Sequence, residues 1–301
     1  MRLNPEFGGG MSRRHFLAGV AAAPFLLGAA SENAPMPPPR PQEPFRVGII
    51  GAGPAGLRHF EALRNHPEAR VHAVCDVDAA RLRAFSEKEG GQTPVVSDYR
   101  RVLEMRDIQV VVIAAPTHWH ATMAVHACQA FKQVLLETPV TSTVEEGFWL
   151  AESAANYARV VQTVNSGRFT AAGCALRDYI RSGALGAVSK VECWASTNPE
   201  GGDPTADGEA PADLNWDAWL GPSRWMSYNP GRCHDGWRWI MDLGGGRLMD
   251  EGAAMFSLMS DCLDLDSKAP TRISASGRAP ASGLWDAPVE MAVEWSFDAP
   301  A

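Results

Sequence analysis

The stretch FRVGIIGAGPAG, residues 45–56, decides the fold of this 301-residue chain. Its first half is a short apolar run that predicts a strand, and a helical pattern follows to about residue 66. The three glycines stand in the spacing that a dinucleotide-binding turn requires: a tight turn, a close approach to a pyrophosphate, and close packing of helix on strand. A helix N-terminus also offers N–H groups to phosphates. The residues predicted to contact a dinucleotide here are Gly51, Gly53, Pro54, Ala55 and Gly56.

A spaced acid supports this interpretation and indicates which dinucleotide is bound. Asp76 lies twenty residues past Gly56, directly after a second apolar run at 71–75. A carboxylate at the end of the second strand accepts hydrogen bonds from both ribose hydroxyls of NAD and repels the 2′-phosphate of NADP. Arg81 could soften that preference, but we expect it on the solvent face of the next helix. The sequence therefore favours NAD over NADP, and the alternative is a degenerate domain that keeps the glycines and binds nothing.

Composition describes an ordinary globular protein and excludes some partners. The chain is 46% hydrophobic and 21% charged, and its formal net charge of −8 argues against nucleic acid and anionic membrane surfaces. None of its six cysteines forms a CxxC pair, and we predict no metal site.

The N-terminus carries an export pattern. Ser12-Arg-Arg-His-Phe-Leu17 matches a twin-arginine signal, and the apolar stretch that follows to Ala30 is too short for a transmembrane span. We expect a signal peptide at 1–30, a proline-rich linker at 31–44, and a periplasmic or secreted protein that meets the twin-arginine export machinery. Because free NAD is scarce outside the cytoplasm, such an enzyme would hold its cofactor tightly and return it to its starting redox state.

Strand and helix patterns alternate as far as Asn165 and change afterwards. The alternation predicts a doubly wound parallel sheet over 45–165, with residues 116–120 as a loop after the strand at 110–115 and a capping box from Thr143 to Glu146. A second domain is expected over 166–301, with a helix at 172–182 and strands at 188–194, 273–277 and 289–297. The fold class is therefore α/β.

Six tryptophans lie between residues 194 and 239, interleaved with Asn, Asp, Gly and Pro. Flat aromatic faces beside amides and carboxylates suit a sugar, whose C–H faces stack and whose hydroxyls need polar partners. The alternative is that the tryptophans anchor a long loop to the sheet, and the sequence does not separate the two.

The motifs together resemble the Gfo/Idh/MocA family, the relatives of glucose–fructose oxidoreductase and inositol dehydrogenase. The likeness extends from Phe45 to Phe297. It rests on the blocks at 51–59, 74–78, 115–121, 137–139, 180–186, 215–222 and 228–252. It implies a Rossmann domain followed by a domain with a large, mostly antiparallel sheet that carries the substrate and often forms a dimer interface. Family members usually continue past the point where this chain stops, so we expect a fragment or a trimmed sheet, and a homo-oligomer only where that sheet is complete.

The resemblance also implies site residues and shows two departures. It places Ala115, Thr117, His120, Glu137 and Thr138 against the cofactor, with Asp250 and His120 as the catalytic candidates. The family usually has a lysine where this chain has Thr138, and a histidine where it has Ala254. Neither a threonine hydroxyl nor a methyl group titrates near neutral pH, so neither replaces a proton-transferring group.

Other candidates come from the segment at 233–239. His234, Trp237 and Arg238 match a family segment that reaches the substrate cavity, although Arg238 could instead pair with Asp235 or Asp242. His120 could line the site or only pack there, and His118 could point to solvent.

Three functions remain open at this stage. The first is an exported NAD(P)-dependent oxidoreductase acting on a sugar or polyol, with hydride transfer at the nicotinamide and with catalysis altered by Thr138 and Ala254. The second is a pseudoenzyme that binds nucleotide or sugar without turnover. The third is an NAD-dependent glycosidase or epimerase that oxidises and re-reduces the same sugar.

Overall fold

A computed structural model describes residues 43–202 and 205–298. The expected signal peptide lies outside these residues, as does the expected linker except for its last two positions. Within the described part, no helix is long and apolar enough to cross a membrane.

A six-stranded parallel sheet forms the first domain, as predicted. Its strand order is β3-β2-β1-β4-β5-β6, with the crossover between β3 and β4 that a doubly wound fold requires. The strands are β1 (Phe45–Ile50), β2 (Ala69–Cys75), β3 (Val95–Val96), β4 (Val110–Ile113), β5 (Gln133–Glu137) and β6 (Val161–Val164). Ile113 and Leu136 are fully buried, because helices cover both faces of the sheet.

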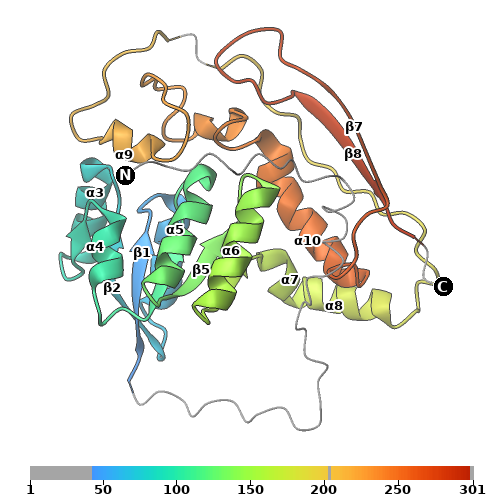
Figure 1. The fold of residues 1–301 in the computed structure, drawn as a ribbon, viewed down its shortest axis with the longest axis horizontal. Helices are drawn as coiled ribbons and strands as arrows, with labels where there is room; N and C mark the ends of the chain where they lie inside the picture. Colours follow the sequence, from blue (N-terminus) through green and yellow to red (C-terminus); the bar gives the residue numbers. More distant parts are fainter. Residues whose placement is uncertain (1–42, 203–204, 299–301) are drawn as a thin grey trace, which may run out of the picture.

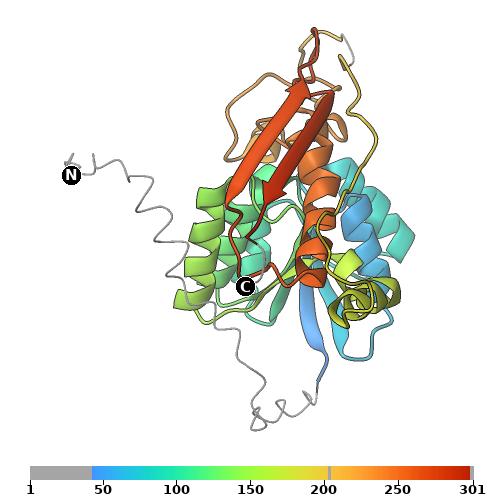
Figure 2. The ribbon, with the colours of Figure 1, turned by 90° about the vertical axis from the view of Figure 1, so that its right-hand side faces the viewer.

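Two helical layers produce two separate cores. One face is covered by α2 (Pro54–Leu63) and α3 (Ala79–Glu89), which pack Phe60 and Phe85 edge to face with ring centroids 4.8 Å apart. The other face is covered by α4 (Tyr99–Glu104), α5 (Thr117–Gln129) and α6 (Val144–Asn156). Figure 2 shows α5 and α6 on the opposite side of the sheet from the blue and cyan helices.

Local sequence explains where these helices begin. Thr143 and Glu146 form the predicted capping box at the start of α6, and Asp78 caps α3 by accepting from two backbone N–H groups. The expected loop at 116–120 is wrong, because α5 begins at Thr117 with Pro116 at its N-cap. Proline fits that place, since its fixed φ suits the entry to a helix and the N–H that it lacks has no partner there.

The second domain contains less regular structure than predicted. It has α7 (Ser166–Phe169), α8 (Ala171–Arg181), α9 (Trp216–Leu220), a 3₁₀ turn (Gly236–Trp239), a π-helical turn (Leu248–Gly252), α10 (Ala253–Cys262), β7 (Arg272–Arg278) and β8 (Glu290–Ser296). β7 and β8 form a two-stranded antiparallel ribbon above α10 (Figure 1). The large sheet implied by the family resemblance is therefore a small one in the described residues. The strand expected at 188–194 is absent from them, because no neighbouring strand pairs with that segment.

Most of the tryptophan-rich segment is a third small core. Trp216 stacks on Trp219 with ring centroids 4.8 Å apart, and both are buried with Trp237. Trp194 and Trp225 lie at the surface instead, 82% and 72% exposed. Packing therefore accounts for the three buried rings. Trp239 is half-buried, and the Arg247 guanidinium lies over its ring.

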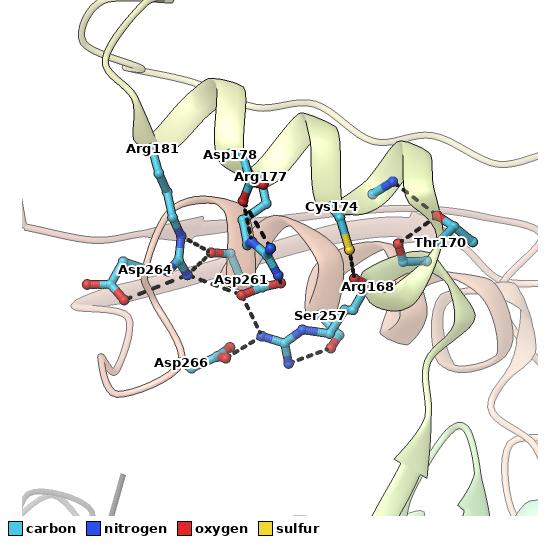
Figure 3. A network of polar contacts seen from close by, with 12 residues as sticks. Arg168, Thr170, Cys174, Arg177, Asp178, Arg181, Ser257, Asp261, Asp264 and Asp266 are labelled. Carbon is cyan, nitrogen blue, oxygen red and sulfur yellow. Dashed lines mark hydrogen bonds and ion pairs between the residues drawn. The ribbon is translucent and has the colours of Figure 1, made fainter. Parts of the chain in front are cut away.

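An ion-pair network joins the two helical parts of the second domain (Figure 3). The Asp261 carboxylate on α10 lies within 3.1–3.7 Å of guanidinium nitrogens of Arg168, Arg177 and Arg181. Arg168 also binds Asp266. Arg168 belongs to α7, which begins one residue after Asn165 at the carboxyl end of β6. The network therefore fixes α10 relative to the carboxyl edge of the parallel sheet.

Candidate functional site

The glycine-rich turn has the geometry that its sequence predicts. Gly51 adopts φ +105°, and a Cβ there would lie 2.5 Å from the carbonyl oxygen of Ala114. A Cβ on Gly56 would lie 1.7 Å from the carbonyl oxygen of Gly51, so helix and strand can approach this closely only with glycine. Gly53 is the N-cap of α2, and no side chain caps that helix. The backbone N–H groups at the N-terminus of α2 therefore remain for a phosphate.

The Asp76 carboxylate is fixed beside this turn. Its Oδ2 accepts from the Ala52 N–H at 2.8 Å, and its Oδ1 accepts from the Asp78 N–H at 3.0 Å. We expected Arg81 on the solvent face of α3, and this was wrong. Its guanidinium nitrogen lies 2.9 Å from the place of a Cβ on Gly53, so it faces the glycine turn. With Lys88 it lines a cavity of about 270 Å³ along α2 and α3, which puts two cations beside the predicted pyrophosphate position.

A second cavity, of about 230 Å³, lies at the carboxyl end of β5 and β6. It is lined by Arg58, His59, Glu137, Thr138, Val164, Asn165 and Ala254. The two positions where this chain departs from the family, Thr138 and Ala254, thus meet in one cavity although they lie far apart in the sequence.

Asn165 is the most unusual side chain of this cavity. It is 2% exposed, yet neither its Oδ1 nor its Nδ2 has a hydrogen-bond partner. A buried polar group without a partner costs about 1–3 kcal/mol, so a native protein keeps one where a ligand supplies the missing bond. A donor and an acceptor side by side suit a carboxamide such as that of nicotinamide. The glycine turn, Asp76 and this orphaned amide together fit an NAD molecule.

Glu137 lies at the end of β5 and is paired with His59 from α2. The His59 Nε2 lies 2.8 Å from the Glu137 Oε1, and both side chains are mostly buried. Burial raises the pKa of the Glu137 carboxyl, but the hydrogen bond with His59 and the positive charge around the carboxylate, including that of Arg58, lower it by more, so the pKa lies below its usual value. His59 and Asn165 were not predicted as site residues from the sequence. Their positions, three residues past Gly56 and directly after β6, were the signals available.

His120 is not placed for proton transfer, contrary to our expectation. The ring is 1% exposed, and its Nδ1 and Nε2 lie 2.6 and 2.8 Å from the carbonyl oxygens of Pro139 and Ala115. Burial lowers its pKa, which opposes a charged ring. His120 therefore connects the strand ends that carry Ala115 and Glu137, and is a positioning residue. Thr117 is also buried, in the first turn of α5.

His118 is buried rather than turned to solvent. Its Nε2 lies 3.0 Å from the Trp219 carbonyl oxygen, so it joins α5 to α9. Desolvation lowers its pKa to about 4.

Asp250 lies in the π-helical turn next to Arg238. The Asp250 Oδ2 and the Arg238 Nε are 3.6 Å apart, and the Arg238 guanidinium stacks 4.7 Å over the Trp237 ring. Burial raises the pKa of Asp250, opposed in part by Arg238. The charges of Glu251 and Glu137 also raise it. Asp250, Arg238 and Trp237 therefore form one polar and aromatic group. Arg238 also makes the alternative pair with Asp235, whose Oδ1 lies 3.4 Å from the Arg238 Nη1 and whose side chain is exposed.

Trp237, Arg238 and His234 line neither cavity, although we expected all three to reach the substrate. The His234 ring contacts other segments. Its Nε2 lies 2.7 Å from the Asp78 Oδ2, and its Nδ1 lies 3.1 Å from the Cys233 Sγ. It instead ties the tryptophan-rich segment to the N-cap of α3. Within the described residues, no group of three His, Cys, Asp or Glu side chains could hold a metal ion.

Sequence comparison identifies both domains. Residues 45–165 match the family model described as "Oxidoreductase family, NAD-binding Rossmann fold", and residues 177–286 match its C-terminal alpha/beta domain. The chain belongs to the Gfo/Idh/MocA oxidoreductase family. Its first domain is accordingly an NAD-binding Rossmann domain.

The curated relatives of this chain are named as glycoside hydrolases rather than as oxidoreductases. A glycosyl hydrolase family 109 protein of Shewanella sp. (strain W3-18-1) is 31% identical over 184 residues, and an alpha-N-acetylgalactosaminidase of Shewanella oneidensis is 32% identical over 185. Each match covers 52% of this chain and 40% of the relative. The matched part is thus less than half of those proteins.

Solved structures confirm the fold. The WlbA dehydrogenase from Chromobactrium violaceum, in complex with NADH and UDP-GlcNAcA, matches with a TM-score of 0.62 at 20% identity, over 87% of this chain and 67% of that one. GenD2 from gentamicin A biosynthesis, in complex with NAD, matches with a TM-score of 0.61 at 18% identity, over 88% of this chain and 65% of that one.

Proposed function

We propose that this chain is an exported, NAD-dependent oxidoreductase that acts on a sugar or polyol and holds its cofactor tightly. The observation that carries the proposal is the cavity at the carboxyl edge of the NAD-binding sheet, where the orphaned amide of Asn165 lies beside Glu137 and Thr138. Ligands of open parallel sheets bind at that edge. NAD bound there would accept a hydride from the substrate.

The chain's own residues would do the rest. The glycine turn and the N-terminus of α2 would hold the pyrophosphate, with Asp76 on the ribose hydroxyls. Asp250 and Arg238 would bind substrate hydroxyls, and the exposed edge of the cavity would admit the sugar. Thr138 offers a hydroxyl and Ala254 leaves space, so neither contributes a charge to the reacting atoms.

A first experiment tests cofactor and reaction together. The purified protein is denatured, and any released nicotinamide nucleotide is identified by mass spectrometry and by absorbance. The intact protein is then incubated with NAD and with myo-inositol, UDP-GlcNAcA or an aryl α-N-acetylgalactosaminide. Stoichiometric NAD or NADH with turnover of one substrate supports the proposal. A protein that neither retains nor takes up NAD, or that binds it without turning over any substrate, contradicts it and favours a non-catalytic binding protein.

An NAD-dependent glycosidase is the second candidate, favoured by the names of the Shewanella relatives. Release of the aryl group without net NADH formation would identify it, since the sugar is oxidised and reduced again within one cycle. The variants Thr138→Lys and Ala254→His separate the two candidates further. A large rate gain indicates a weakened dehydrogenase, and loss of an existing glycosidase activity indicates rearranged chemistry.

A further inference from the structure

The cavity lacks the two titratable groups that the family resemblance places around the reacting carbon. Thr138 and Ala254 both line it, and neither carries a proton that moves near neutral pH. The two buried histidines of α5 do not compensate. His118 binds the Trp219 carbonyl oxygen, and both nitrogens of His120 face backbone carbonyl oxygens. A proton acceptor for the substrate hydroxyl must therefore come from another element.

His59 is the one described histidine that lines this cavity. Its Nε2 lies 2.8 Å from the Glu137 Oε1, and a carboxylate can only accept, so Nε2 carries a proton. In the neutral form of that ring, Nδ1 carries a lone pair. No partner binds that nitrogen in the described structure, and it is not sealed from solvent. A carboxylate on one ring nitrogen and a free lone pair on the other is the arrangement of a general base held by an orienting acid.

We propose that His59 is the general base of this site and that Glu137 is the residue that positions it. The proposal rests on the proposed function above. In the oxidising direction the substrate O–H proton passes to His59 Nδ1, the C–H hydride passes to NAD, and the alcohol carbon becomes a carbonyl. In the reducing direction the same proton and hydride return. Electrons and protons balance with NAD as the only oxidant.

The charged groups that act on the pair belong to separate elements. Arg58 on α2 acts on Glu137 through its charge, and the Asp250 carboxylate, paired with Arg238, belongs to the π-helical turn. Arg58 lines the same cavity and forms no ion pair with another described residue, so it balances the Glu137 charge without replacing the hydrogen bond to His59.

The test combines kinetics with a spectroscopic readout that needs no substrate. The proton assignment of the His59 ring is read from nitrogen chemical shifts of the labelled protein, with the signal assigned by its loss in His59→Asn. Wild type should show the Nε2–H tautomer. In Glu137→Gln the amide can donate to Nε2, so a share of the ring should move to the Nδ1–H tautomer.

The kinetic arm uses NAD with whichever of the substrates named above the wild type turns over. General bases contribute about 10²–10⁴ in rate, so His59→Asn should lower kcat by about 100-fold or more with KM little changed. In Glu137→Gln the kcat should fall by a similar factor. The kcat of the double variant should be no lower than that of either single variant, because the two residues act as a unit.

Matched controls lie on the same helix and the loop after it. His66→Asn and Glu61→Gln change exposed side chains near the end of α2 and should leave kcat unchanged. An Nδ1–H tautomer in wild type, a His59→Asn variant with wild-type kcat, or additive losses in the double variant would overturn the dyad while the proposed function stands. A wild type that turns over none of the substrates contradicts the proposed function itself.

Discussion

Replacing Asn165 with leucine should make the protein more stable while weakening its hold on NAD. The side chain is buried, and both its amide atoms lack a partner. Leucine branches at the same carbon and has nearly the same shape. Each buried unpaired polar group costs about 1–3 kcal/mol, and the leucine must still fit a cavity wall, so we expect a net gain of about 1–2 kcal/mol in the free energy of unfolding. The backbone bonds of Asn165, to Thr163 and Arg168, stay in place.

Two melting curves measure the effect. Without NAD, the variant should melt higher by about 2–4 °C for each kcal/mol gained. NAD at a hundred times its Kd stabilises the wild type by about 2.7 kcal/mol, and a tenfold loss of affinity reduces this to about 1.4 kcal/mol at the same concentration. The melting temperature without NAD should therefore rise, while the shift that NAD induces should shrink. Asn156→Leu, on the exposed face of α6, is the control and should change neither by more than about 0.5 kcal/mol.

Two results for Asn165→Leu would contradict this prediction. A variant that melts lower than wild type would show that Asn165 is satisfied in the free protein. A variant that melts higher but keeps the full NAD-induced shift would show that the amide does not contact the cofactor.

Three further predictions follow from single contacts. Gly56→Ala should abolish NAD-induced stabilisation in calorimetry, because its Cβ would lie 1.7 Å from a backbone oxygen; retained binding would contradict the close packing of α2 on β1. Asp261→Asn should lower the free energy of unfolding in urea by about 2 kcal/mol, because it leaves three guanidinium groups together, and an unchanged midpoint would show that the network is energetically idle. His118 has a folded pKa of about 4, below its ordinary value of 6.5, so the unfolded chain binds its proton more tightly. The neutral His118 ring contributes at most about 3 kcal/mol to the free energy of unfolding, and this contribution is fully present above pH 6.5 and is lost as the pH falls towards 4. In His118→Gln the free energy of unfolding should therefore depend less on pH between 6.5 and 4.

The glycine spacing and Asp76 could be interpreted from sequence because their roles are local. A tight turn, a helix N-terminus and a strand end are set by neighbours within a few residues, and the structure has all three where the pattern predicts them. The parallel sheet followed for a similar reason, since buried strands and amphipathic helices alternate along the chain. The strand prediction for 188–194 was wrong because an alternating pattern says which residues could face a core but not which strand would pair with them. The pairing partner is not set by neighbouring residues.

The roles of the histidines were not predictable in the same way. Each of three histidines in or beside an expected loop hydrogen-bonds to a distant segment. His120 bonds to Pro139, His118 to Trp219 and His234 to Asp78. Such partners lie between 19 and 156 residues away along the chain, and no spacing rule relates them.

The sequence by itself determined that this chain has an NAD-binding doubly wound domain and that two family residues are replaced, because these are matters of residue identity and short-range spacing. Only the tertiary structure decided which side chains face the reaction. It brought Thr138, Asn165 and Ala254 around one cavity and set His59 against Glu137 across 78 positions of sequence. A site at the edge of a parallel sheet is assembled from the ends of separate strands and helices, so its membership depends on packing that no local pattern encodes.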